Sequence, residues 1–144
     1  MSFNAFVIWL LQSPFHGLLS GNTVLIGYVG TKTGKQYLVP VNFVRVAGED
    51  GDHLLVTSER GRTWWRSLRG GSAVEVYLSG TERKGIARSL EDADDVEAGL
   101  MTYLSHAPGN ARYFKVAIDE DGEPRLEDVV RAAHGRVIIE VDLS

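Results

Sequence analysis

Residues 23–46, TVLIGYVGTKTGKQYLVPVNFVRV, decide the fold class of this chain. β-branched and aromatic residues dominate residues 23–29 and 36–46, and glycines bound the polar stretch between these two runs. Such runs are typical of strands, and a short connection containing glycine predicts that they form a β-hairpin. Pro40 interrupts the second run, which indicates an edge or a bulge at that position. The chain is therefore expected to be mainly β, with residues 30–35 forming a turn.

Three further strands are expected at residues 53–58, 73–78 and 81–88, because the same residue types recur between Gly-containing turns. Five consecutive antiparallel strands over residues 23–90 form a meander, which tends to close or half-close into a barrel. Residues 62–69 lose the alternation and predict a short helical turn ended by two glycines.

The rest of the chain predicts helices and one last strand. Ser89 to Asp92 has the spacing of a capping box, and a helix is expected to follow it as far as Pro108. A short helix is expected at residues 126–133 and a final strand at 137–141. We expect one domain over residues 1–144, a split β-barrel with flanking helices. Residues 1–21 are its N-terminal helix and lead-in, 23–90 its meander, and 90–144 its helices and final strand.

Composition excludes several classes of function. The 15 basic and 19 acidic residues give a net charge of -4, which argues against a nucleic-acid partner. No cysteine is present, so thiolate nucleophiles and cysteine-ligated zinc are excluded, and a reducing cytoplasm is compatible with the chain. The four histidines lack ligand spacing, so no metal site is expected.

The apolar run at residues 5–11 is too short for a membrane span and lacks the charged start of a signal peptide. A short helix that covers apolar surface, as a lid or at a homodimer interface, is the preferred interpretation. An interfacial anchor at a membrane is the alternative, but no basic residue precedes Lys32. The expected location is therefore the cytoplasm, with peripheral membrane contact left open and no integral membrane segment.

The turn GTKTGK at residues 30–35 has the composition of an anion site. It fails as a P-loop, because three residues separate its glycines and a strand follows it. Backbone amides, two threonine hydroxyls and two ammonium groups can nevertheless bind a phosphate. Taken alone, the stretch is better interpreted as a hydrophilic hairpin turn.

A second stretch favours the interpretation of the turn as part of a ligand site. Residues 60–71, RGRTWWRSLRGG, combine four arginines with Trp64 and Trp65. This mixture suits either an exposed face anchored by one buried ring or a flat aromatic cofactor with an anionic tail. Composition alone does not choose between the two.

The two stretches together, with the Val-Pro-Val strand segment at residues 39–41, resemble the deazaflavin (F420)-dependent nitroreductase and quinone reductase family. The lead-in SPFHGLLSG at residues 13–21 is similar to that of some members. The resemblance covers roughly residues 13 to 90. It implies a split β-barrel of the FMN/F420-binding type and an oxidoreductase that transfers a hydride from reduced F420 to a small planar acceptor, a quinone or nitroaromatic.

The resemblance also implies roles for individual residues. The phosphate or acidic tail of F420 is expected on Thr31, Lys32, Thr33, Gly34 and Lys35. The ring is expected beside Pro40 and Val41, with its polar edge near Ser58. The remaining candidates are Arg60, Arg62, Trp64 and Trp65 for the cofactor and Trp64 and Tyr113 for the substrate.

This chain also departs from the family pattern. The segment between Ser58 and Trp64 is shorter, which leaves Arg60 and Arg62 without a secure counterpart, and Tyr37 replaces a basic residue. Tyr113 is a candidate by position only, and a core tyrosine is the alternative. An FMN-dependent oxidoreductase and a non-catalytic ligand-binding protein stay open as alternatives.

Overall fold

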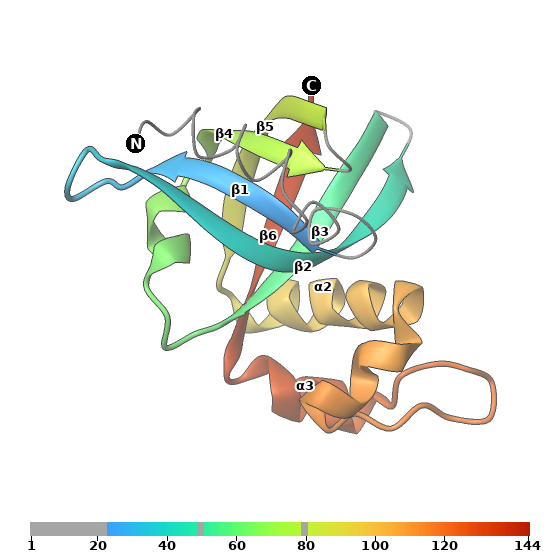
Figure 1. Cartoon of the computed structure of the whole chain (residues 1–144). Helices are drawn as coiled ribbons and strands as arrows, with labels where there is room; N and C mark the ends of the chain where they lie inside the picture. Colours follow the sequence, from blue (N-terminus) through green and yellow to red (C-terminus); the bar gives the residue numbers. More distant parts are fainter. Residues whose placement is uncertain (1–22, 49–50, 79–80) are drawn as a thin grey trace.

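The computed structural model describes residues 23–48, 51–78 and 81–144, and these residues form a closed barrel with its two α-helices on one side (Figure 1). The strand order around the barrel is β1-β2-β3-β6-β5-β4, and every neighbouring pair is antiparallel. The strands are β1 Thr23–Val29, β2 Gln36–Gly48, β3 Gly51–Glu59, β4 Ser72–Leu78, β5 Thr81–Leu90 and β6 Arg136–Leu143. The expected N-terminal helix at residues 5–11 and the lead-in at 13–21 lie outside the described residues.

Alternation along the strands fills the barrel with β-branched side chains. Val24 and Ile26 of β1 and Val39, Val41 and Phe43 of β2 point into one buried cluster. Side chains of a strand point alternately to its two faces, so this pattern fixes the register of the hairpin. The mainly β barrel with flanking helices is confirmed.

The strand β2 has two neighbours over only part of its length. Pro40 pairs with Leu25 of β1, whereas the pairing of β2 with β3 begins at Phe43. A proline, which cannot donate to a ladder, therefore lies where β2 is bonded on one side. The expected edge position of Pro40 is confirmed.

The meander expected over residues 23–90 needs a correction. The strands β1, β2 and β3 follow one another, but β3 pairs with β6 and not with β4. The hairpin of β4 and β5 then closes the ring, because β5 pairs with β6 and β4 pairs with β1. The pattern of local runs predicts each strand but carries no information on this long-range pairing.

Three helical elements follow β5, namely α2 Ala93–His106, η3 Pro108–Phe114 and α3 Leu126–Ala133. They cover the outer face of β2, β3 and β6, where Val44, Leu55 and Ile138 pack against a second buried cluster that includes Val96 and Leu100. Figure 1 shows α2 and α3 on the same side of the barrel. No helix within the described ranges is long and apolar enough to cross a membrane.

The capping box proposed for Ser89 is wrong. Ser89 belongs to β5, and Asp92 occupies the N-cap position of α2 without a capping hydrogen bond from its side chain. The short helix expected after Arg62 is confirmed as η2, a 3-10 helix over Trp64–Leu68. Gly70 and Gly71, with φ of 78° and 94°, follow it in the left-handed region that glycine tolerates.

Candidate functional site

The turn at residues 30–35 and the helix η2 lie side by side. The amide nitrogen of Thr31 donates a 3.3 Å hydrogen bond to Oγ of Ser67. Between the two segments lies a groove of about 350 Å³, which we call the turn groove. Its walls come from the turn, from the adjoining strands and from η2, and include Tyr28, Gly30, Thr31, Lys32, Thr33, Tyr37, Thr63, Trp64, Arg66 and Ser67. The structure thus joins two stretches that the sequence analysis singled out separately.

Internal hydrogen bonds already occupy most of the turn's own amides. The amides of Gly30 and Gly34 donate to the carbonyls of Lys35 and Gly30, and the amide of Lys35 donates to Oγ1 of Thr33. With the Thr31 bond to Ser67, four of the six amides have protein partners. The sequence argument that exposed amides bind an anion therefore applies at most to residues 32 and 33, and any anion depends mainly on the two ammonium groups.

Aromatic rings form one wall of the turn groove. Tyr28 and Tyr37 stack with ring centroids 5.5 Å apart, and Tyr28 lies 5.9 Å from Trp64. Oγ1 of Thr33 and the hydroxyl of Tyr37 are hydrogen-bonded at 3.0 Å, which ties this wall to the turn. A Cβ at Gly30 would lie 2.8 Å from the Tyr37 ring, so only glycine lets the turn pack this closely.

The titration of Tyr28 reflects this crowding. Burial raises the pKa of Tyr28 above its ordinary value, the nearby Tyr37 raises it further, and Arg62 lowers it. Tyr28 is therefore a neutral phenol at physiological pH. Arg62 itself lines the pocket described next.

A second pocket, of about 500 Å³, lies on the outer face of the barrel beside η3, and we call it the Arg136 pocket. It brings together Pro40, Val41, Arg62 and Tyr113, four of the residues proposed from sequence. Further lining residues are Thr57, Glu59, Asn110, Phe114 and Arg136. Because Arg62 lines this pocket and Thr63 lines the turn groove, the two meet at consecutive residues.

Ser58 and Trp64 form a buried pair. Nε1 of Trp64 donates a 3.1 Å hydrogen bond to Oγ of Ser58, which in turn donates to the carbonyl of Glu59. Ser58 is only 5% exposed. Its side chain therefore positions Trp64 at the edge of the turn groove, and its proposed contact with a cofactor ring stays a prediction.

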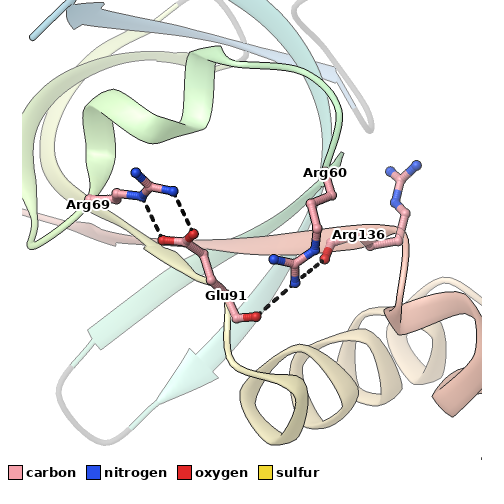
Figure 2. Close-up of polar contacts among 4 residues, drawn as sticks. All are labelled: Arg60, Arg69, Glu91 and Arg136. Atoms are coloured by element: carbon pink, nitrogen blue, oxygen red, sulfur yellow. Dashed lines mark hydrogen bonds and ion pairs between the residues drawn. The ribbon is translucent and has the colours of Figure 1, made fainter.

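Arg60 and Arg69 are held by Glu91, as Figure 2 shows. Nη2 of Arg60 donates to the carbonyl oxygens of Glu91 and Arg136, at 2.8 and 3.1 Å. Arg69 makes two 2.9 Å bonds to the Glu91 carboxylate. That bidentate contact raises the pKa of Arg69 and holds the pKa of Glu91 below its usual range. Arg60, just after β3, and Arg69, just after η2, thus connect these two elements to the segment that leads into α2.

Trp65 is a core residue with 2% of its surface exposed. The guanidinium groups of Arg66 and Arg69 lie 5.6 and 5.2 Å from its ring centroid. The stretch at residues 60–71 thus divides: Trp64 borders the turn groove, whereas Trp65 anchors η2 in the barrel. The interpretation as a face anchored by one buried ring applies to Trp65, and the contact of Trp64 with a cofactor stays a prediction.

Several lining residues escaped the sequence analysis. Tyr28 was overlooked because a tyrosine in a strand resembles any other core residue, and Tyr37 was noted only as a departure from the family pattern, although their register, Tyr28 opposite Tyr37, follows from the hairpin. Arg136 was overlooked because it begins the last strand, far along the chain from every motif. Among the described residues, no group of three histidine, aspartate or glutamate side chains could hold a metal ion.

Comparison with known proteins extends these observations. The sequence matches no known family profile and no curated protein. Among solved structures, one described as a domain-swapped dimer aligns with a TM-score of 0.54 and 20% identity, over 96% of this chain and 95% of its own. A pyridoxamine 5'-phosphate oxidase-related, FMN-binding protein from Nostoc punctiforme aligns with a TM-score of 0.52 and 12% identity, over 97% of this chain and 78% of its own.

A structure of an F420-H2 dependent reductase, FDR-A, aligns with a TM-score of 0.47 and 19% identity, over 88% of this chain and 96% of its own. The likenesses with TM-scores above 0.5 establish the fold, a split barrel of the type found in FMN-binding proteins. The expected fold class is confirmed at this level.

Proposed function

We propose that the chain is an oxidoreductase that binds reduced deazaflavin F420 in the turn groove and passes a hydride to a small planar acceptor. One observation carries the proposal: the lysine-containing turn and the Trp64 segment, the two motifs that resemble the F420-dependent reductases, line a single groove.

The residues present fit such a cofactor. A flat ring with an anionic tail needs aromatic walls and nearby cations, and the groove supplies Tyr28, Tyr37 and Trp64 together with Lys32 and Arg66. Its volume of about 350 Å³ is within the range of small-molecule sites. A long cofactor tail can extend into solvent beside Lys35, which is exposed.

The protein's role in the proposed reaction is to bind, orient and exclude water. Lys32 and Lys35 pair with the phosphate or acidic tail, and the aromatic wall covers the ring. The acceptor binds in the Arg136 pocket, which adjoins the groove at Arg62 and Thr63. The reduced deazaflavin, when bound, supplies the hydride, so the chain needs no nucleophile of its own.

FMN is the second candidate cofactor. It also combines a tricyclic ring with a phosphate, and the Nostoc punctiforme protein with the same fold is described as FMN-binding.

The proposal further includes a cytoplasmic enzyme that forms a homodimer, in keeping with the structural relative described as a domain-swapped dimer. Sedimentation of the purified protein measures its oligomeric state.

The test is a pair of fluorescence titrations of the purified protein, one with F420 and one with FMN, under the same conditions. Saturable binding of F420 but not FMN supports the deazaflavin proposal, and oxidation of bound reduced F420 by quinones or nitroaromatics supports catalysis. Preference for FMN moves the protein to the flavin-dependent alternative. Binding without turnover across the acceptor panel favours a carrier, and binding of neither cofactor overturns the proposal.

A further inference from the structure

The Arg136 pocket contains a cation that the proposed function has not used. Nε of Arg136 donates a 3.1 Å hydrogen bond to Oγ1 of Thr57, and its guanidinium lies 4.9 Å from the centroid of the Phe114 ring. The carbonyl of Arg136 accepts from Arg60, and in Figure 2 the Arg136 side chain points away from that contact. A ring face, a hydroxyl and a bonded backbone therefore fix the guanidinium in one orientation.

The outer edge of this guanidinium is free to bind a ligand. Within residues 23–48, 51–78 and 81–144, its two terminal nitrogens form no hydrogen bond or ion pair. Glu59 lines the same pocket and raises the pKa of Arg136, but it forms no ion pair with that residue. Burial acts in the opposite direction and is the larger effect, lowering the pKa of Arg136.

The partly buried guanidinium of Arg136 has lost part of its hydration, and the nearby charge of Glu59 compensates only part of that loss. An anion that enters the pocket compensates for the lost hydration. The planar donor pair of a guanidinium fits the two oxygens of a carboxylate best. Arg62 adds a second positive charge to the lining, so the two arginines outweigh Glu59. Pro40, Tyr113 and Phe114 offer flat or apolar surface for the rest of a ligand.

We propose that the Arg136 pocket binds a planar molecule with a carboxylate, and that Arg136 is the residue that pairs with this group. The pocket adjoins the turn groove, in which the proposed function places the cofactor. On that proposed function, the ligand of the Arg136 pocket is the electron acceptor, so the acceptor carries the carboxylate. Neutral quinones and nitroaromatics are then poorer acceptors than analogues of the same size with a carboxylate. Arg136 and Glu59 set this specificity in opposite directions.

Binding is tested directly with benzoate, and with benzamide as the neutral probe of the same shape. Both are titrated into ¹⁵N-labelled protein, and the Nε–H signal of Arg136 is followed by NMR. We expect benzoate to shift this signal saturably and benzamide to leave it unchanged. Equal responses to the two probes, or no response to benzoate, overturn the proposal.

Variants separate charge recognition from a structural role. Arg136→Gln should weaken benzoate binding at least about tenfold, and Arg136→Lys should recover part of the loss. Glu59→Gln should tighten benzoate binding, because it removes the negative charge of the pocket without touching the Thr57 and Phe114 contacts. Arg88→Gln, which removes an exposed arginine paired with Glu140, is the charge-matched control and should change nothing. Unchanged affinity in folded Arg136→Gln, or weaker binding in Glu59→Gln, contradicts the assignment.

The benzoate titration needs no cofactor, so it fails or succeeds independently of the proposed function. Benzoate binding that depends on Arg136, in a protein that binds neither F420 nor FMN, supports the carboxylate site and contradicts the proposed reductase function. Cofactor turnover with the same kcat/KM for charged and neutral acceptors, in a protein that does not bind benzoate, contradicts the carboxylate site and supports the proposed reductase function.

Discussion

The amide of Thr31 donates a hydrogen bond to Oγ of Ser67, and this contact fixes the lysine-containing turn against the 3-10 helix η2. Without this contact, the turn would be held by its two strands and by the hydrogen bond between Thr33 and Tyr37, but not against η2. With the contact in place, Lys32 lies on the edge of a groove that also contains Trp64. The hydrogen bond is therefore the simplest point at which to disturb the proposed cofactor site without touching a charge.

Ser67→Ala should weaken F420 binding by about 2- to 13-fold, the equivalent of one ordinary hydrogen bond of about 0.5–1.5 kcal/mol. The thermal midpoint should change little, because the contact is exposed. Fluorescence titration measures the affinity, and Ser105→Ala, at an exposed serine of α2, serves as the control. An affinity equal to that of the wild type would show that the turn does not need this contact.

Changing both Lys32 and Lys35 to alanine should weaken F420 binding by several kcal/mol, since each charge-assisted contact contributes about 1.5–3 kcal/mol. Lys84→Ala combined with Lys115→Ala removes the same charge elsewhere and should leave the affinity unchanged. Titration of the two double variants at low and moderate salt separates local pairing from the general field of the protein. If both double variants lose affinity equally, the turn has no special role.

Ser58→Ala should destabilise the protein by about 1–3 kcal/mol, because it leaves the buried Nε1 of Trp64 without its acceptor. Urea unfolding measures the loss. In a double-mutant cycle with Trp64→Phe, which removes the donor, the two costs should sum to more than the cost of the double variant. Simple additivity would mean that the hydrogen bond contributes nothing.

Gly85→Ala should destabilise the barrel by about 1–3 kcal/mol or more through overpacking. A Cβ at this position in β5 would lie 2.6 Å from the carbonyl oxygen of Asp142 in β6, and a backbone atom in a paired strand has little room to move. Gly61→Ala meets nothing within 4 Å and is the matched control. Chemical denaturation should separate the two variants clearly, and equal stabilities would contradict this account of the β5–β6 contact.

Acid should remove the contribution of the contact between Glu91 and Arg69. Because the pKa of Glu91 is lowered in the folded protein, its stabilising effect is complete above the ordinary glutamate value, about 4.3, and declines as the pH falls through the lower folded value. The difference in unfolding free energy between wild type and Glu91→Gln should shrink below about pH 4.3. A difference that is constant from neutral pH down to pH 2 would assign the effect to packing.

Local patterns in the sequence predicted the local structure well. The bounds of β1 and α3 agree with the expected ranges, because the β-branched and aromatic run in Thr23–Val29 and the apolar spacing in Leu126–Ala133 depend only on nearby residues. The capping box at Ser89 failed because β5 continues through Leu90, so pairing with β6 overrides a local capping signal. The order of strands around the barrel failed for the same reason, since it depends on contacts between distant segments.

In the candidate site, too, local features could be predicted from the sequence and contacts between distant segments could not. Residue types predicted the turn and the Trp64 segment, and both line the turn groove. Pro40 and Val41, which the family resemblance places beside the same cofactor, line the Arg136 pocket instead. Sequence could not tell Trp64 from Trp65, which differ only in the direction that each ring takes from a single helical turn. Nor could it find Arg136, whose neighbours Thr57 and Phe114 come from distant parts of the chain.

The position of β6 between β3 and β5 has a consequence for biosynthesis. Until residues 136–143 have left the ribosome, β3 and β5 each present an open edge, and the barrel cannot close. Pairs such as Glu59 with Arg136 span much of the chain, and such long-range pairing folds slowly. The nascent chain therefore exposes the edge of β3 after residue 59 and the edge of β5 after residue 90, in each case until β6 is made, which makes it a candidate for chaperone binding and for aggregation when it is overproduced. Stop codons before residue 136 should yield insoluble product.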